Sequence, residues 1–317
     1  MQPTRREIVG SAATALAACA IRGKPLQAAE PPAHAPNRPN PWHIGVSTYS
    51  FWHFKDTREP TVTKCIDLAA EMGFDGVEIL EQHMTDEEKT DAGLQQLKKR
   101  VYANGLCLMG FSVHQGFVYP EAEKRQQNID LTKHFIEMAY KMGIPVMRLN
   151  TGRWNSIASF DDLMANKGIE PILPGHTEDE GFKWCIDAIE QCLPKAQECG
   201  VTLALENHWG LGRTAAGLLR IYNAIKSPWL KLLLDTGNFL DDSYQQMEQI
   251  APHAVLVQAK TYFGGGEWYT LEIDYARVAE IFHKAGFKGW ISLEFEGKEP
   301  AMIGVPKSLA LLRSKLV

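Results

Sequence analysis

The chain has 317 residues, 45% of them hydrophobic and 22% charged, which is typical of globular proteins and excludes a disordered or collagen-like chain. Its 33 basic and 38 acidic residues give a net charge of −5, which disfavours a nucleic-acid partner because such partners usually need a basic surface. No apolar run reaches the roughly 18 residues of a membrane-spanning helix.

The first residues have the pattern of an export signal. Arg5 and Arg6 precede an Ala-rich apolar stretch that is too short to cross a bilayer, as in twin-arginine signals, so we expect residues 1–29 to direct export to the periplasm. The run that ends at Cys19 resembles a lipobox and would place a lipid anchor there, although Ala18–Ala20 would serve equally as an ordinary cleavage site. The Pro-rich residues 30–41 are predicted to form a linker, and residues 42–317 the catalytic domain.

From Trp42 onward, one unit of a short apolar run, a polar loop and an amphipathic helix recurs eight times. Nearly continuous apolar character is expected of parallel strands that are buried on both faces. The predicted strands are Ile44–Thr48, Gly76–Leu80, Cys107–Ser112, Val146–Asn150, Thr202–Glu206, Lys231–Asp235, Val255–Lys260 and Trp290–Glu294. The predicted helices cover residues 61–72, 86–104, 121–142, 180–199, 213–225, 242–251, 274–285 and 306–315, and Pro194 is expected to kink or divide the fourth.

Eight strand–helix units predict a single-domain α/β fold, a (β/α)8 TIM barrel. The alternative is an open, doubly wound sheet, which usually has a Gly-rich first turn. Neither a G-x-G-x-x-G motif after the first strand nor a G-x-x-x-x-G-K-[ST] motif is present, so dinucleotide-binding and P-loop folds are not supported.

Acidic residues end three of the predicted strands. Glu206, Asp235 and Glu294 each close an apolar run, and the carboxyl ends of barrel strands form the active site in this architecture. Buried charges must be paired or bound to metal, so three converging carboxylates predict a divalent cation, with Gln258 as a fourth oxygen ligand. The alternative is that each acid caps a strand or pairs with a lysine.

Three segments carry a resemblance to a known family, namely Leu205–His208, Leu234–Asn238 and Ser292–Glu294. They resemble the sugar phosphate isomerase/epimerase group of xylose isomerase-like barrels, over essentially all of residues 42–315. In that family a Glu, an Asp, a His and a Glu bind one divalent metal, which implies Glu206, Asp235, Gln258 and Glu294 here. Gln258 replaces the usual His, so the site becomes all-oxygen and favours Mn²⁺ or Mg²⁺, with Co²⁺ and Zn²⁺ as alternatives.

The resemblance also implies that Glu206 and Glu294 exchange a proton with the sugar on opposite sides. Lys260 and His208 are further catalytic candidates, each with a structural ion pair or loop hydrogen bond as the alternative. The candidates for substrate binding are polar residues at strand ends and tryptophans in two loops, one the long Thr151–Asp179 segment and the other Gly-rich: Glu78, His114, Arg148, Arg153, Trp154 and Trp268.

These features predict a metal-dependent sugar isomerase or epimerase that removes a proton next to a carbonyl through a metal-stabilised enediolate. One alternative is a lyase that eliminates the C1 substituent of a 3-keto-glycoside through the same enolate. Another is a non-catalytic sugar-binding barrel. The expected partner is a small carbohydrate rather than a nucleic acid. The oligomeric state, a homo-oligomer included, stays open.

Overall fold

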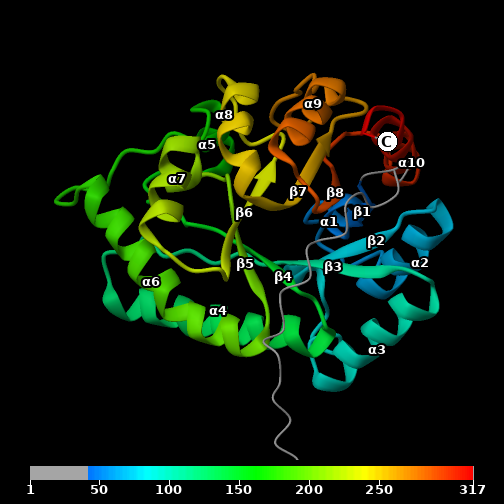
Figure 1. The fold of residues 1–317 in the computed structure, drawn as a ribbon, viewed down its shortest axis with the longest axis horizontal. Helices are drawn as coiled ribbons and strands as arrows, with labels where there is room; N and C mark the ends of the chain where they lie inside the picture. The colour runs from blue at the N-terminus through cyan, green and yellow to red at the C-terminus, as the bar shows by residue number, and fades with distance from the viewer. Residues whose placement is uncertain (1–41, 317) are drawn as a thin grey trace, which may run out of the picture. The chain divides into compact units, whose positions relative to one another are not determined.

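A computed structural model describes residues 42–316, and these form a closed barrel of eight parallel strands (Figure 1). Each strand pairs with the next, and β1 closes the ring against β8, where Gly45 lies opposite Ser292. The strands are β1 Ile44–Ser47, β2 Gly76–Leu80, β3 Cys107–Ser112, β4 Val146–Leu149, β5 Thr202–Glu206, β6 Leu230–Asp235, β7 Ala254–Thr261 and β8 Trp290–Phe295. The prediction of a single-domain (β/α)8 TIM barrel is therefore confirmed.

Helices surround the barrel between successive strands (Figure 1). They are α1 Tyr49–Trp52, α2 Val62–Met72, α3 Asp91–Ala103, α4 Ala122–Met142, α5 Phe160–Ala165, α6 Glu178–Cys199, α7 Ala215–Ala224, α8 Ser243–Ile250, α9 Tyr275–Ala285 and α10 Ala301–Leu316. Three short 3-10 turns lie at Glu81–His83, Gly210–Gly212 and Ala251–His253. No described helix is both long and apolar enough to cross a bilayer. The predicted export signal, its Cys19 and the linker lie outside the described residues.

Three helix predictions need correction. α3 begins at Asp91 rather than near residue 86, because the Thr90 hydroxyl accepts a hydrogen bond from the Gly93 N–H and caps the helix there. α10 begins at Ala301, and Pro306 lies inside it rather than at its start. Pro194 does not divide α6, which runs as one helix from Glu178 to Cys199.

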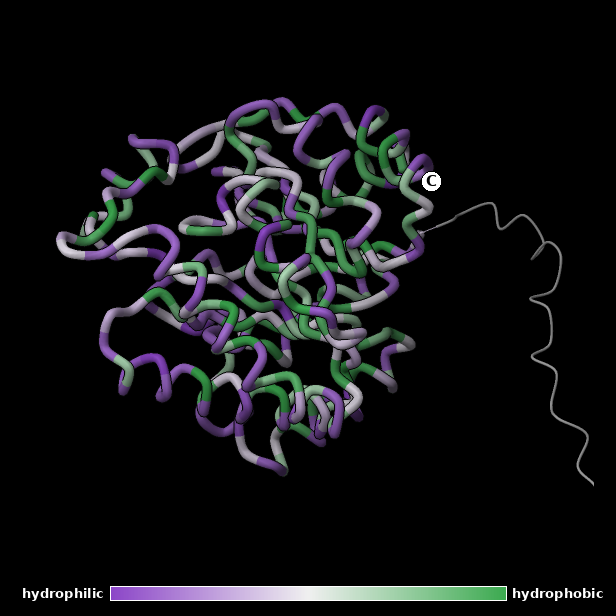
Figure 2. Tube along the Cα trace, turned by 60° about the vertical axis from the view of Figure 1, so that its left-hand side comes forward, coloured by the Kyte–Doolittle hydropathy of each residue, from purple (hydrophilic) through white to green (hydrophobic). Residues whose placement is uncertain are grey.

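The barrel interior is closed by apolar side chains at its N-terminal end. Met109 fills the space beside Gly45, where a Cβ atom would lie only 2.5 Å from the Met109 sulfur. Figure 2 shows apolar segments running through the centre of the described part of the chain. Burial of both strand faces explains the apolar runs, and it leaves the C-terminal strand ends as the place where buried polar residues gather.

Candidate active site

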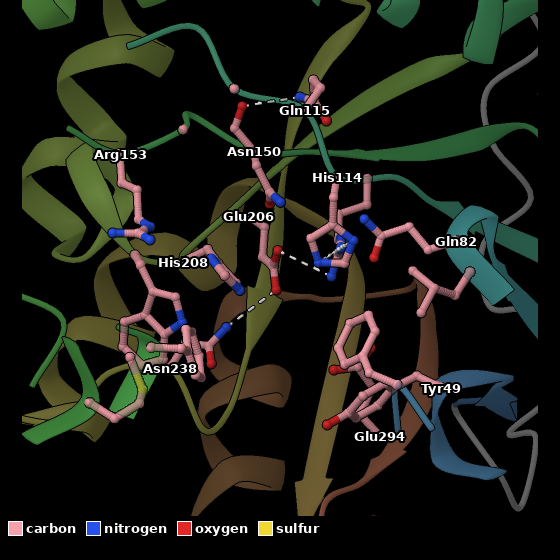
Figure 3. Close-up of a pocket in the computed structure, with 18 of the residues that line it drawn as sticks. Tyr49, Gln82, His114, Gln115, Asn150, Arg153, Glu206, His208, Asn238 and Glu294 are labelled. Atoms are coloured by element: carbon pink, nitrogen blue, oxygen red, sulfur yellow. Dashed lines mark hydrogen bonds and ion pairs between the residues drawn. The ribbon is translucent and has the colours of Figure 1, made fainter. Parts of the chain in front are cut away.

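A cavity of ≈ 640 Å³ lies at the C-terminal end of the barrel (Figure 3). Its lining includes eight of the residues that the sequence analysis selected: His114, Arg148, Arg153, Glu206, His208, Lys260, Trp268 and Glu294. The other four, Glu78, Trp154, Asp235 and Gln258, do not line it. The predicted site residues are thus divided between those that line the cavity and those that do not.

Lys260 on β7 joins three acidic residues of neighbouring strands. Its ammonium nitrogen lies 3.5 Å from Asp235 Oδ2 and 3.3 Å from Glu294 Oε2, and it also pairs with Glu296. Burial alone would lower the pKa of Lys260, but the three carboxylates outweigh burial and raise that pKa well above its usual range. Lys260 is therefore a fixed positive charge at the cavity surface. Gly237 leaves room for it, since a Cβ there would lie 2.5 Å from Lys260 Cδ.

Glu206 at the end of β5 faces a second cation. Its Oε2 atom lies 3.5 Å from Arg148 Nη1, and its Oε1 atom accepts a hydrogen bond of 3.2 Å from Asn238 Nδ2 (Figure 3). Both Glu206 and Arg148 are almost fully buried. Burial raises the pKa of Glu206 to about 7, against the opposing effect of Arg148. This carboxyl group therefore has a proton affinity suited to acid–base chemistry near neutral pH.

Two asparagines link the ends of β5 and β6, one through the backbone of Asp235 and the other through the carboxylate of Glu206. Asn207, next to Glu206, accepts from the Asp235 N–H at 2.7 Å and donates to the Asp235 carbonyl at 2.9 Å. Asn238, three residues after Asp235, donates to Glu206. The Gly237 N–H donates to Asp235 Oδ1 at 2.7 Å, which leaves Oδ2 for Lys260. Burial raises the pKa of Asp235 well above its usual range, although Lys260 opposes the shift.

Glu78 belongs to a hydrogen-bond network that crosses the barrel interior. The Ser112 hydroxyl donates to Glu78 Oε1, and Gln258 Nε2 donates to the same oxygen at 2.9 Å. Burial, together with the charge of Glu294, raises the pKa of Glu78. Because Glu78 binds the amide nitrogen, the carbonyl oxygen of Gln258 is left without a donor. Glu78, which was predicted to bind substrate, does not line the cavity, and its carboxylate accepts hydrogen bonds from Gln258 and Ser112.

The donor chemistry fits a hard divalent cation. Glu206 Oε2, Asp235 Oδ2 and Gln258 Oε1 are buried oxygens that accept no hydrogen bond, and they come from consecutive strands. The first two each lie 3.5 Å from a cationic nitrogen, of Arg148 and Lys260 respectively. Within residues 42–316, however, no three His, Cys, Asp or Glu side chains lie close enough together to form a metal site. The four predicted ligands thus offer an oxygen-only set that is not assembled around one point.

Two histidines on the cavity wall are neutral. Burial lowers the pKa of His114 and of His208 well below the usual range, and the charges of Arg148 and Lys260 add to the effect. The centroids of the two imidazole rings lie 6.4 Å apart. In the view of Figure 3, the Glu206 side chain is projected between them. Neutral imidazoles at this position can donate a hydrogen bond to the hydroxyl groups of a ligand or accept one from them.

The two tryptophans of the prediction have different roles. Trp154 is 6% exposed and packs against Trp184 of α6, with ring centroids 5.9 Å apart, so it belongs to the core and not to the cavity wall. Its position near the start of the loop after β4 did not reveal that α6 would cover it. Trp268 does line the cavity. Arg153 lines it too, while its guanidinium pairs with the buried Glu170 and donates to the Ile157 carbonyl at 2.9 Å.

Sequence reasoning did not select Tyr49, Asn238 and Glu296. Glu296 lies one residue beyond β8 and pairs with Lys260, and its position two residues after Glu294 could have indicated it. Asn238 was noted only as the last residue of the Leu234–Asn238 segment. In the structure its side chain donates a hydrogen bond to Glu206, which gives this residue a role in the site. Tyr49 lines the cavity from the short helix α1, which is too short to be predicted from the periodicity of apolar residues.

The fold has several known relatives in structure. The chain is similar to the apo form of 3-keto-D-glucoside 4-epimerase from E. coli, with 16% identity, a TM-score of 0.67 and coverage of 86% of this chain and 99% of that one. D-Psicose 3-epimerase from Clostridium cellulolyticum H10, solved with D-tagatose, has 16% identity and a TM-score of 0.65, and the match covers 86% of this chain and 99% of that one. An L-ribulose 3-epimerase has 15% identity and a TM-score of 0.69, and the match covers 87% of this chain and 94% of that one. At these identities the likeness concerns the fold.

A search among curated protein sequences finds no match to this chain. The family model of the xylose isomerase-like TIM barrel, in contrast, matches residues 66–315, which span seven of the eight barrel strands and the three carboxylates that line the cavity. The chain belongs to the family of xylose isomerase-like TIM barrels.

Proposed function

We propose that the protein is a sugar isomerase or epimerase that moves a proton at a carbon next to a carbonyl group. The observation that carries this proposal is the pair Glu206 and Glu294, two nearly buried carboxylates that line one cavity beside the cations Arg148 and Lys260. Acid–base groups next to fixed positive charge are what enolate chemistry requires. The epimerases that share the fold support a sugar as substrate.

The chain's own residues account for the proton transfer. Glu206 and Glu294 stand on strands that are three apart in the barrel, so they approach a bound sugar from different directions. One carboxylate takes the proton from the carbon, and the other, when protonated, returns a proton from its own side. Asn238 fixes the orientation of Glu206 through Oε1. Lys260 places its ammonium group where it stabilises negative charge that develops on the substrate oxygen.

We further propose a divalent cation held by Glu206, Asp235, Gln258 and Glu294. The site contains five carboxyl groups, Glu78, Glu206, Asp235, Glu294 and Glu296, against the two cations Lys260 and Arg148, an excess of three acids. A bound divalent ion offsets most of this excess and would polarise the sugar carbonyl as a Lewis acid. An oxygen-only donor set favours Mn²⁺, then Mg²⁺, with Co²⁺ and Zn²⁺ as alternatives.

A 3-keto-glycoside lyase is the second candidate. It begins with the same proton removal and then expels the C1 substituent instead of returning the proton. The size of the cavity favours keeping this candidate, because ≈ 640 Å³ gives space for a substituent beyond the sugar ring.

Product analysis separates these reactions. The full chain, supplied with Mn²⁺, is incubated with free ketoses and with methyl 3-keto-glucoside, and proton NMR identifies the products. We expect an epimer or an aldose–ketose isomer. Release of methanol would establish the lyase instead. Saturable sugar binding without any product would indicate a sugar-binding barrel. Glu198→Gln, an exposed carboxylate on α6, is the matched control and should retain full activity.

A further inference from the structure

The cavity has a charged floor and an aromatic rim. Glu206, Lys260 and Glu294 are each at most 6% exposed, whereas Phe54 and Trp268 are 48% and 43% exposed, although all five residues line the same space. The volume of ≈ 640 Å³ lies in the range of about 300–1,000 Å³ that encloses drug-sized ligands. A single sugar ring on the floor therefore leaves the rim unfilled.

Trp268 is fixed in the rim by a contact between two loops. Its ring lies 4.7 Å from the Phe160 ring at an angle of 76°, and its indole N–H donates to Asp161 Oδ1 at 2.7 Å. Phe160 and Asp161 begin α5 in the loop after β4, whereas Trp268 follows β7. Since β4 and β7 are three strands apart in the ring, this contact joins loops from separate parts of the barrel mouth. The indole is thus held in place while nearly half of it stays exposed.

Phe54 is presented to the cavity by an unusual backbone. Both His53 and Phe54 have positive φ angles, 52° and 54°, a conformation that bulky residues rarely adopt. The His53 ring nitrogen Nε2 bonds to the Phe295 carbonyl at 2.7 Å and anchors this turn. The Phe54 ring contacts the His114 ring edge-on, with centroids 5.9 Å apart. Backbone strain of this kind persists where the surrounding structure enforces it, and it is common at ligand sites.

Unpartnered acceptors also line the cavity. Gln115 Oε1 and Asn150 Oδ1 receive no hydrogen bond, although their residues are only 7% and 5% exposed. Gln115 Nε2 donates to the Asn150 carbonyl at 3.1 Å, which orients the amide and leaves its oxygen available. Figure 3 shows both side chains at the end of the view away from Glu294. Buried acceptors of this kind require donors, and sugar hydroxyl groups supply them.

We propose that this cavity binds glycosides as two-ring ligands. The sugar ring that reacts occupies the floor beside Glu206 and Glu294, and the aglycone ring packs against Phe54 and Trp268. This inference rests on the proposed function and narrows its substrate from free monosaccharides to glycosides. Aromatic faces bury the flat C–H surface of a ring, so the aglycone is a second sugar or an aryl group.

Binding without turnover tests the subsite. Isothermal titration of the full chain uses methyl β-D-glucoside, phenyl β-D-glucoside and cellobiose, and the same three ligands of the galactose series, with lactose as the disaccharide. These ligands carry no keto group, so the result does not depend on catalysis. We expect one series to bind, with a two-ring member at least about tenfold tighter than its methyl glycoside. If the phenyl glycoside has the higher affinity, the aglycone is an aryl group. If the disaccharide has the higher affinity, the aglycone is a second sugar.

Single-residue variants show which side chains cause the higher affinity for two-ring ligands. Trp268→Ala and Phe54→Ala should each remove most of the tenfold preference and leave the affinity for the methyl glycoside within about twofold. Tyr102→Ala on α3, where the ring is 86% exposed and lies outside the cavity, should change neither value. Three results would overturn the subsite. They are equal affinity for one-ring and two-ring ligands, an equal loss of affinity for both kinds of ligand in the variants, and no saturable binding at all. Failure of the proposed function would instead appear as the absence of product with intact glycoside binding.

Discussion

At the scale of single residues, charge balance is the central feature of this site. Arg148 faces Glu206 and Lys260 faces Asp235, two carboxylates that burial makes hard to ionise, and the acids outnumber the two cations. A buried charge that lacks a partner is costly, so we expect such a cluster to take up protons or a cation from solution. Both responses are measurable in this protein.

Replacing Glu206 by Gln should change the pH dependence of stability. The folded pKa of about 7 exceeds the usual 4.5, so between these pH values the folded state binds more protons than the unfolded state. Stability from this group is therefore present below pH 4.5 and is lost as pH rises to about 7. At 1.36 kcal/mol per pKa unit, wild type should lose about 3 kcal/mol relative to Glu206→Gln over this window.

Urea denaturation from pH 4.5 to 8 in the presence of a chelator measures the difference between the two proteins. Glu198→Gln is the control, because its carboxylate is 69% exposed and should give a profile parallel to wild type. A parallel profile for Glu206→Gln as well would show that Glu206 has an ordinary proton affinity.

Gln258 stands where the resemblance to sugar isomerases and epimerases implies a His ligand, and changing it to His should change the proposed metal preference. An imidazole in an oxygen-only set favours Zn²⁺ over Mn²⁺. Metal titration of Gln258→His should therefore give a higher ratio of Zn²⁺ to Mn²⁺ affinity than wild type. Gln249→His, on the exposed side of α8, is the control. An unchanged ratio would mean that residue 258 does not bind the ion.

The strand-end carboxylates could be predicted from sequence because a charge at the end of a buried apolar run is costly unless a partner or an ion compensates it. A lysine pair was one of the alternatives for these acids, but the actual contacts of each partner could not be predicted. Lys260 pairs with Glu296, and Glu78 turns to Gln258 across the barrel, through contacts whose geometry depends on how eight strands close. Spacing along the chain carries no information about such contacts.

At the scale of secondary structure elements, the same limit separates the two tryptophans. Both follow strands and both are aromatic, yet Trp154 is covered by α6 and Trp268 remains exposed on its loop. Strands and most helices followed from apolar periodicity, and their ends agree closely with the structure. Packing against a distant helix is decided in three dimensions.

Truncation of the two tryptophans should show this difference. Trp154→Ala leaves a cavity between the β4 loop and α6, and large-to-small changes of a buried aromatic residue cost about 3–5 kcal/mol. Trp268→Ala removes a half-exposed ring and should cost about 1 kcal/mol or less. Urea denaturation of both variants measures the free energy of unfolding. Equal losses would contradict the placement of Trp154 in the core.

At the scale of the whole molecule, the barrel brings strand ends together that are far apart in sequence. Glu78 and Gln258 are separated by 180 positions and share a hydrogen bond. The eightfold recurrence of one unit made this architecture predictable, because few folds repeat strand and helix in that number. The loops were less predictable. α5 lies inside what had been expected to be a long loop, and its contact with Trp268 joins two loops.

A bound cation should stabilise the entire domain by mass action. After removal of metal with a chelator, Mn²⁺ at a hundred times its dissociation constant should add about 2.7 kcal/mol of stability and raise the melting temperature. Asp235→Asn should lose this gain, whereas Asp187→Asn, a half-exposed carboxylate on α6, should keep it. A melting temperature that does not respond to Mn²⁺, with no metal found by elemental analysis, would contradict the cation site.

The most direct measurement of the central claim is the exchange of carbon-bound hydrogen with solvent. In D₂O, wild type should introduce deuterium at the carbon next to the carbonyl of a sugar substrate, as followed by proton NMR. Glu206→Gln and Glu294→Gln should each slow this exchange by at least about 100-fold while the barrel remains folded. Exchange at the wild-type rate in both variants, or none in the wild type with sugar bound, would contradict the account.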